Sequence, residues 1–157
     1  MKVVYLRSVE LFYFFKEELK EKISVALKYF PELKYETIYV GVITDNSVDG
    51  RADDVNRIIK FRVNVPPSYV TVFHELAHLA IRWLSEQGVK LPKTEEFCSI
   101  FAMARMPPEL IDINKIPYIG EPRIPKEQIP ILCRKALEYR KKHRNYIQWL
   151  RKQAKIV

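Results

Sequence analysis

Residues 57–88 restrict the fold most, because a strand pattern is followed there by a helix pattern. Apolar and polar residues alternate through residues 57–65, which predicts a half-buried strand. Two prolines and Ser68 come next, and serine is a preferred residue at the start of a helix. We expect a helix from Ser68 to Gly88, since glycine commonly ends helices. A strand and a long helix must therefore pack together in the first half of the chain.

Two further strands and one helix are expected before this segment. Residues 2–6 and 37–43 are rich in β-branched and aromatic residues and predict strands. Residues 8–30 have apolar residues at spacings of three and four, which predicts a helix capped by Ser8 and ended by Pro31. Residues 45–54 contain Asp, Asn, Ser and Gly and predict a turn.

After Gly88 the patterns predict helices. One helix is expected to begin at Pro92 or Thr94 and to end at Pro107. Four prolines in residues 109–130 exclude a long regular element, and a last helix is expected from about 126 or 131 to 154. The predicted fold class is α+β: a small, mostly antiparallel sheet packs on the helix 68–88, and a largely helical C-terminal half follows.

The length of 157 residues predicts a single domain, 1–157, with a Pro-rich segment at 107–130 and a basic helix at 131–157. The two cysteines, Cys98 and Cys133, lie far apart and suggest a reducing compartment without disulfides. The apolar run near the N-terminus is too short to span a bilayer. We therefore expect a cytoplasmic protein without a membrane partner.

The charge is concentrated at the C-terminal end. Residues 131–157 contain nine Lys or Arg and one acid, Glu138, so this segment accounts for the whole net charge of +8. Three interpretations stay open: a solvated helix face, a surface for nucleic acid or an acidic partner, or a lid. As a lid, the segment would hold the Pro-rich stretch across a cleft, with Glu121 at an open metal position.

Residues 74–78 read His-Glu-Leu-Ala-His and match the pattern His-Glu-x-x-His of zinc peptidases. Residues four apart on a helix project from adjacent turns of one face, so His74 and His78 can bind one Zn²⁺. Glu75 lies about 100° further around the helix axis and can reach a metal-bound water. The motif is short, but its position inside a capped, apolar helix favours a metal site over two unliganded histidines.

A catalytic zinc has three protein ligands, and the next helix, TEEFCSIFAMARMP, suggests the third. The two helices together resemble the gluzincin metallopeptidases, in particular the ImmA/IrrE-type peptidases and the compact minigluzincins. The resemblance covers roughly residues 57–108, about a third of the chain. It implies that Glu95 is the third zinc ligand, because Phe101 and Ala102 then match the Phe-Ala pair of the family's second helix.

The match departs from the family pattern at Ser99, where an Asn or Asp normally supports a zinc-binding histidine. Two other ligands therefore stay open beside Glu95. Glu96 is adjacent but points about 100° away on the helix. Cys98 lies one turn further and would bind as a thiolate, although the family has a small packing residue there.

Gluzincins also use a His or Tyr outside the motif to polarise the substrate carbonyl. His143 is the remaining histidine, and its place in the apolar stripe of the last helix favours a core residue over a catalytic donor. Tyr69, Tyr118 and Tyr139 are further candidates that the sequence does not rank.

The predicted function is hydrolysis of peptide bonds in a protein or peptide substrate by a zinc-dependent endopeptidase with Glu75 as catalytic base. The resemblance implies a regulatory protein as substrate, and also a latent form blocked by its C-terminal segment. Strand 57–65 is a candidate edge strand that would pair with an extended substrate. The alternative function is a non-catalytic, zinc-stabilised protein whose basic C-terminal helix binds nucleic acid or an acidic partner.

Overall fold

The computed structural model describes residues 2–120 and 122–155 of the chain. A four-stranded sheet and a helical C-terminal half confirm the predicted α+β class. The chain divides into two compact units, Met1–Leu91 and Pro92–Val157. The sequence suggested no boundary there, because the connecting residues 87–93 contain only one glycine and one proline.

The sheet of the first unit has the strand order β1-β2-β4-β3 and is mixed, so the prediction of mostly antiparallel strands was wrong. Strands β1 (Lys2–Tyr5), β2 (Thr37–Ile43) and β4 (Ile58–Arg62) run parallel, and only β3 (Gly50–Asp53) runs antiparallel to its neighbour β4. The reason is that the chain crosses back through helices between β1 and β2, which allows both strands to run in one direction.

Strand β3 lies inside the stretch that was predicted as a turn. Its sequence, Gly-Arg-Ala-Asp, contains no β-branched residue, so pairing with β4 rather than local propensity forms it. Strand β4 consequently lies between β2 and β3, and the expectation that residues 57–65 form an edge strand was wrong. The strand at this edge of the sheet is β3.

The helix expected over residues 8–30 is two helices, α1 (Arg7–Phe12) and α2 (Lys16–Leu27). The break follows from Tyr13, whose side chain is buried and whose hydroxyl donates a hydrogen bond to the carbonyl of Val65 at 3.1 Å. A continuous helix would need Tyr13 and its neighbours in a different orientation. Leu6, not Ser8, precedes α1, and its side chain forms no capping hydrogen bond.

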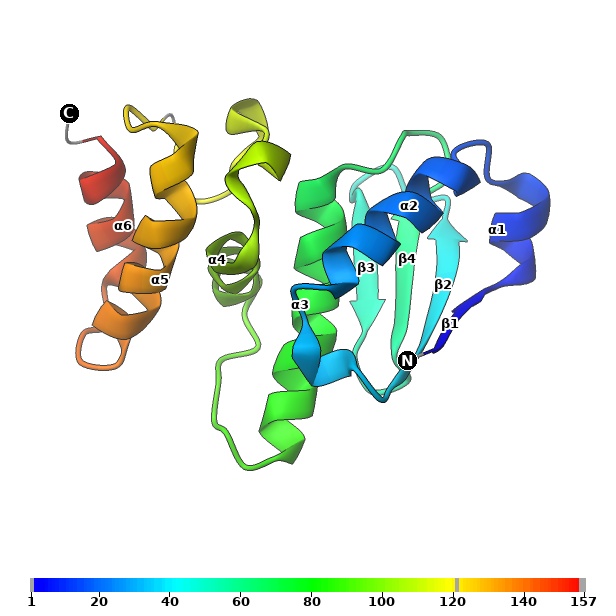
Figure 1. Ribbon diagram of the computed structural model, residues 1–157, viewed down its shortest axis with the longest axis horizontal. Helices are drawn as coiled ribbons and strands as arrows, with labels where there is room; N and C mark the ends of the chain where they lie inside the picture. The colour runs from blue at the N-terminus through cyan, green and yellow to red at the C-terminus, as the bar shows by residue number, and fades with distance from the viewer. Residues whose placement is uncertain (1, 121, 156–157) are drawn as a thin grey trace. The chain divides into compact units, whose positions relative to one another are not determined.

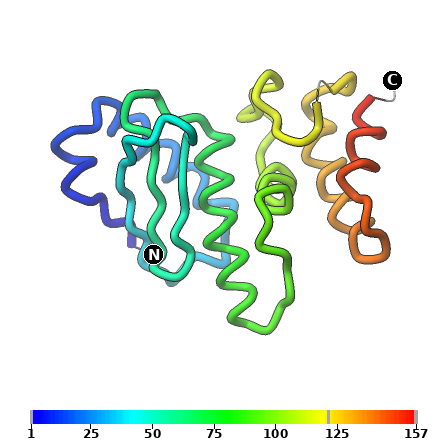
Figure 2. The backbone as a smooth tube through the Cα atoms, turned by 180° about the vertical axis from the view of Figure 1, so that it is seen from behind, coloured from blue at the N-terminus to red at the C-terminus, as the bar shows by residue number. Residues whose placement is uncertain are grey.

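Helices α2 and α3 (Tyr69–Glu86) cover one face of the sheet. In Figure 1, α2 lies in front of the strands, whereas in Figure 2, seen from behind, the strands lie in front of it. The core between these layers is apolar, and Phe30 and Phe73 meet in it with ring centroids 5.6 Å apart. This packing holds α3 against the sheet along its apolar side.

The second unit consists of helices α4 (Glu95–Arg105), α5 (Ile129–Arg140) and α6 (Tyr146–Ala154), with three short 3₁₀ turns in the Pro-rich segment. The single last helix that we expected is therefore two helices that pack on each other. Residues 141–145 are all polar and form the turn, which lets α5 and α6 bury their apolar faces together. His143 lies exposed in this turn, so the prediction of a core histidine was wrong.

None of the described helices is both long enough and apolar enough to cross a membrane. Buried residues of α5 and α6, among them Cys133, Ala136 and Leu150, form part of the core of the second unit. The basic C-terminal segment is therefore a structural part of this unit and not an appended tail.

Candidate metal centre

Helix α3 carries the motif in its middle, and both of its ends are capped as the sequence predicted. The backbone N–H of Thr71 donates to Ser68 Oγ at 3.1 Å. At the other end Gly88 has φ +90°, its N–H donates to the carbonyl of Ser85, and the N–H of Val89 donates to that of Leu84. This pair of bonds is a Schellman cap. The helix is therefore well defined on both sides of residues 74–78.

The imidazoles of His74 and His78 face each other across one turn of α3. Their Nε2 atoms lie 3.2 Å apart, and both side chains are half-buried. Two nitrogens on a tetrahedral Zn²⁺, each about 2.0–2.1 Å from the ion, lie about 3.3 Å from each other. The spacing in this helix therefore fits two ligands of one zinc ion.

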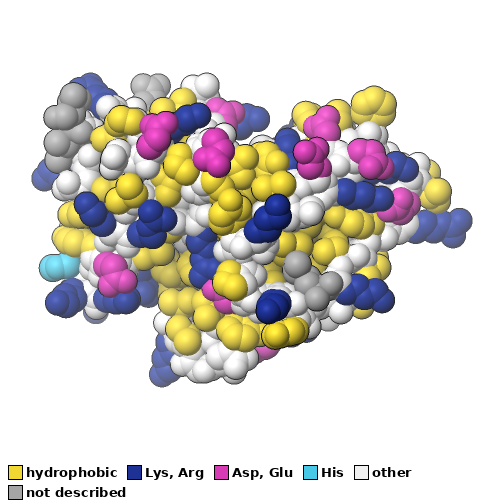
Figure 3. All heavy atoms as spheres, in the orientation of Figure 1, with side chains coloured by type: hydrophobic (Ala, Val, Ile, Leu, Met, Phe, Trp, Pro, Cys, Tyr) yellow, Lys and Arg dark blue, Asp and Glu magenta, His cyan; other side chains and the backbone are white. Residues whose placement is uncertain are grey.

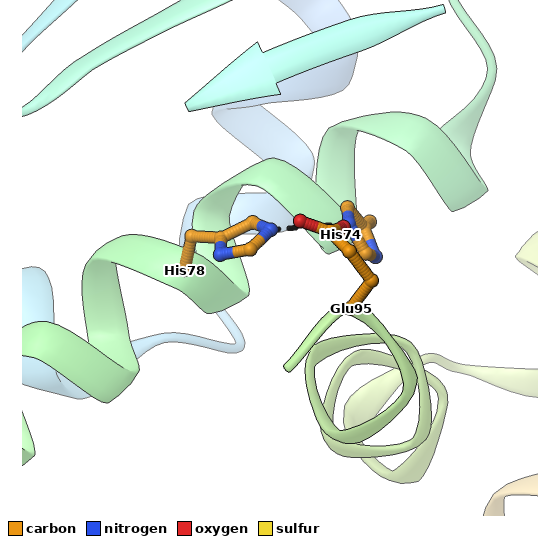
Figure 4. A group of neighbouring side chains, drawn as sticks. All are labelled: His74, His78 and Glu95. Atoms are coloured by element: carbon orange, nitrogen blue, oxygen red, sulfur yellow. Dashed lines mark hydrogen bonds between the residues drawn. The ribbon is translucent and has the colours of Figure 1, made fainter. Parts of the chain in front are cut away.

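Glu95 is the first residue of α4, which Thr94 caps by accepting a hydrogen bond from the N–H of Phe97. One carboxylate oxygen of Glu95 and one ring nitrogen of each histidine all lie within 4.8 Å of one another. Figure 4 draws these three side chains. Glu96 and Cys98 do not belong to this group. Two histidines and one glutamate form a donor set found in catalytic zinc sites, where the fourth position stays open to water.

Glu75 follows His74 on α3 but is turned into the first unit, where its side chain is only 3% exposed. Its carboxylate lies against the backbone of β3. A Cβ atom added to Gly50 would be 2.6 Å from Glu75 Oε2 and 2.9 Å from Thr71 Cγ2. The edge strand can approach the carboxylate this closely only because residue 50 has no side chain.

Gly50 is a site residue that the sequence analysis missed. Its glycine looked like turn chemistry, yet the positive-φ glycines among the described residues are Gly88 and Gly120. Any residue type can therefore adopt the backbone conformation of Gly50. Glycine is required only because a side chain at this position would collide with Glu75 and Thr71. The sequence offered little indication of this role, because the requirement for glycine arises only when β3 packs beside α3.

The face of α4 after Glu95 packs inside the second unit. Cys98 is fully buried and forms no disulfide, and Ser99 is 3% exposed. Phe101 and Ala102 are also buried, and the guanidinium of Arg105 lies 4.3 Å from the ring centroid of Phe101. These positions agree with a packing role for Cys98.

The tyrosines that were candidates for a carbonyl-polarising group lie in different surroundings. Tyr69 is the first residue of α3, and burial followed by the charge of Glu21 raises its pKa. In the second unit, burial followed by the charges of Glu96 and Glu95 raises the pKa of Tyr118. Tyr118 therefore lies in the electrostatic field of the acidic first turn of α4. Tyr139 stacks on the rings of His143 and Trp149.

Glu121, the residue expected at an open metal position in the lid interpretation, lies outside the described residues. Comparison with protein-family models, with curated proteins and with solved structures found no match to this chain.

Proposed function

We propose that the protein is a zinc-dependent peptidase. The single observation that supports this most is the 3.2 Å separation of the two Nε2 atoms, in a helix that also carries a buried glutamate next to the first histidine. His74, His78 and Glu95 would hold the metal. Glu75 would serve as the general base.

The roles of the chain's own residues follow from their positions. A bound zinc ion would acidify water and polarise a carbonyl oxygen. Glu75 accepts a proton from the attacking water and passes it to the leaving amine. The backbone of β3 at Gly50 lies close to the carboxylate of Glu75, and this approach limits the movement of the base before substrate binds.

The edge strand beside this base supports a proposal for the substrate class. An extended peptide can add to the edge of a sheet through main-chain hydrogen bonds, and β3 is the edge strand next to Glu75. An unfolded or loop segment of a protein fits this mode of binding. The resemblance of residues 57–108 to ImmA/IrrE-type peptidases suggests a regulatory protein as the physiological substrate.

The test is Glu75→Gln, which keeps the size of the side chain and removes the base. We expect the variant to bind zinc as the wild type does and to lose cleavage of an unfolded protein by about 10²- to 10⁴-fold, the range for general acid–base catalysis. Glu86→Gln, an exposed position on the same helix, is the matched control and should cleave normally.

A protein that binds one zinc per chain but cleaves no unfolded protein, either as the full chain or in any folded truncated form, would refute the peptidase proposal. It would favour the alternative of a zinc-stabilised binding protein. A wild-type protein that binds no zinc would refute both.

A further inference from the structure

The turn between α5 and α6 concentrates positive charge around a hollow. The hollow has a volume of about 430 Å³, and no acidic side chain lines it. Its lining residues are Arg140, Lys141, Lys142, His143, Arg144 and Tyr146. In Figure 3, Lys and Arg side chains gather at the lower left, where Figure 1 shows this turn. Four adjacent cations repel one another, and an anionic partner would relieve that repulsion.

Few of these cations are neutralised within the protein. Lys141 pairs with Glu138 at 3.0 Å, but both side chains are well exposed, so water screens the pair. The guanidinium of Arg140 lies over the ring of Phe97. Within residues 2–120 and 122–155, Lys142 and Arg144 form no ion pair, and both are exposed. Their charges are therefore available to a partner.

A row of stacked aromatic rings runs beside the hollow. Tyr139 stacks with His143 at 4.1 Å and 22°, and with Trp149 at 4.8 Å and 14°. His143 lines the basic hollow, whereas Tyr139 and Trp149 line a second groove of about 530 Å³. The other residues that line this groove are Ile131, Arg134, Lys135 and Glu138. The aromatic row thus connects a cationic hollow to a groove lined by two aromatic rings, an isoleucine, two cations and one acid.

We propose that this surface binds single-stranded nucleic acid. Phosphates would lie in the hollow against Lys142 and Arg144, and an unpaired base would pack in the groove against Trp149. Single-strand binding sites combine these two elements, a positively charged groove and aromatic rings on which bases stack. A duplex would use the charges but not the rings, because its bases are already stacked on one another. The proposal does not depend on the metal centre or on peptidase activity.

The same residues fit other anionic partners less well. A membrane surface would require apolar side chains at the tip to enter the lipid, and residues 141–145 contain none. An acidic peptide would satisfy the cations but would leave the flat aromatic walls of the groove without a matching group. The joint presence of charge and stacked rings therefore favours a nucleic acid strand.

The experiment uses the full-length chain and fluorescein-labelled 12-nucleotide oligo-dT and oligo-rU, with anisotropy measured over a series of salt concentrations. The variant Lys142→Ala/Arg144→Ala removes two exposed charges. The variant Lys28→Ala/Lys90→Ala removes the same charge from exposed positions in the first unit and is the matched control. A Trp83→Phe protein leaves Trp149 as the only tryptophan, so quenching of its fluorescence reports stacking of a base.

We expect the Lys142/Arg144 variant to bind about two- to thirtyfold more weakly, the range for two exposed ion pairs. Its salt slope, log K against log salt concentration, should be shallower by about 1.4, because each single-strand phosphate contact contributes about 0.7. The control variant should bind like the wild type, and Trp149 should be quenched. Glu75→Gln should bind normally, which separates this proposal from the peptidase proposal.

Four results would overturn the proposal. They are no binding at low salt, equal weakening in both double variants, unchanged Trp149 fluorescence on binding, and tighter binding to a duplex, to poly-glutamate or to anionic vesicles than to a single strand. Circular dichroism of each variant establishes that a loss of binding is not a loss of folding.

Discussion

The close approach of β3 to Glu75 predicts that Gly50→Ala damages catalysis much more than metal binding. The added methyl group would lie 2.6 Å from Glu75 Oε2 and 3.1 Å from Glu75 Cδ, whereas ordinary contacts begin at 3.4 Å. The shortfall at the oxygen is therefore 0.8 Å. The clash is not easily relieved on either side. The side chain of Glu75 is buried, and strand β3, which carries residue 50, is paired with β4.

A displacement of this size has a known range of consequences. A misplacement of about 1 Å can lower the rate of an enzyme about 10²-fold, and overpacking typically costs about 1–3 kcal/mol of stability. We expect a fall of about 10²-fold in kcat for an unfolded protein substrate. Zinc stoichiometry should stay at the wild-type value, because the atoms nearest to the added methyl group belong to Glu75 and Thr71, which are not proposed zinc ligands.

The assay combines cleavage rates, metal content and urea unfolding. Gly41→Ala is the matched control, because Gly41 is the other strand glycine and its added Cβ would meet chiefly the flexible end of Leu6, at 3.1 Å. A double-mutant cycle tests the cause: Gly50→Ala should cost less stability when Glu75 is already alanine, with a coupling energy of about 1 kcal/mol. The reasoning would be refuted if the two substitutions had additive effects on the free energy of unfolding, or if Gly50→Ala kept full activity.

Three more predictions concern the metal ligands, a buried tyrosine and a helix cap. Glu95→Ala should lower zinc content while Glu96→Ala leaves it unchanged, and the reverse result by metal analysis would move the third ligand to Glu96. Burial raises the pKa of Tyr13 to about 12, so its contribution to stability is complete below pH 10 and is lost as pH rises towards 12. Urea unfolding should show a smaller loss over this range in Tyr13→Phe. Ser68→Ala should lower the free energy of unfolding by about 1 kcal/mol, and an unchanged value would show that the N-cap of α3 is dispensable.

The sequence predicted those elements whose signals are local. Ser68 and Gly88 limit α3 through their own hydrogen bonds and backbone angles, so the residues alone were sufficient. Residues 37–43 form β2 as expected, because β-branched residues prefer extended backbone. The spacing of His74 and His78 is likewise a property of one helix, and it accounts for the 3.2 Å separation of their Nε2 atoms.

The sequence failed where distant contacts decide the outcome. Tyr13 interrupts a helical pattern because it bonds to Val65, 52 residues away. Strand β3 exists because β4 pairs with it, and the turn at 141–145 exists because α5 and α6 pack on each other. The requirement for glycine at position 50 is of the same kind, since it arises between a strand and a helix.

The position of β3 at the end of the sheet has a consequence for solubility. Open sheet edges invite pairing with a second copy of the same chain, and proteins limit this with short strands and charged residues. Strand β3 has four residues, and two of them, Arg51 and Asp53, are exposed and charged. Arg51 is also tied to Asp45 by an ion pair of 3.0 Å. Replacing both charged residues of β3 with valine would lengthen the apolar edge, and self-association would then compete with folding.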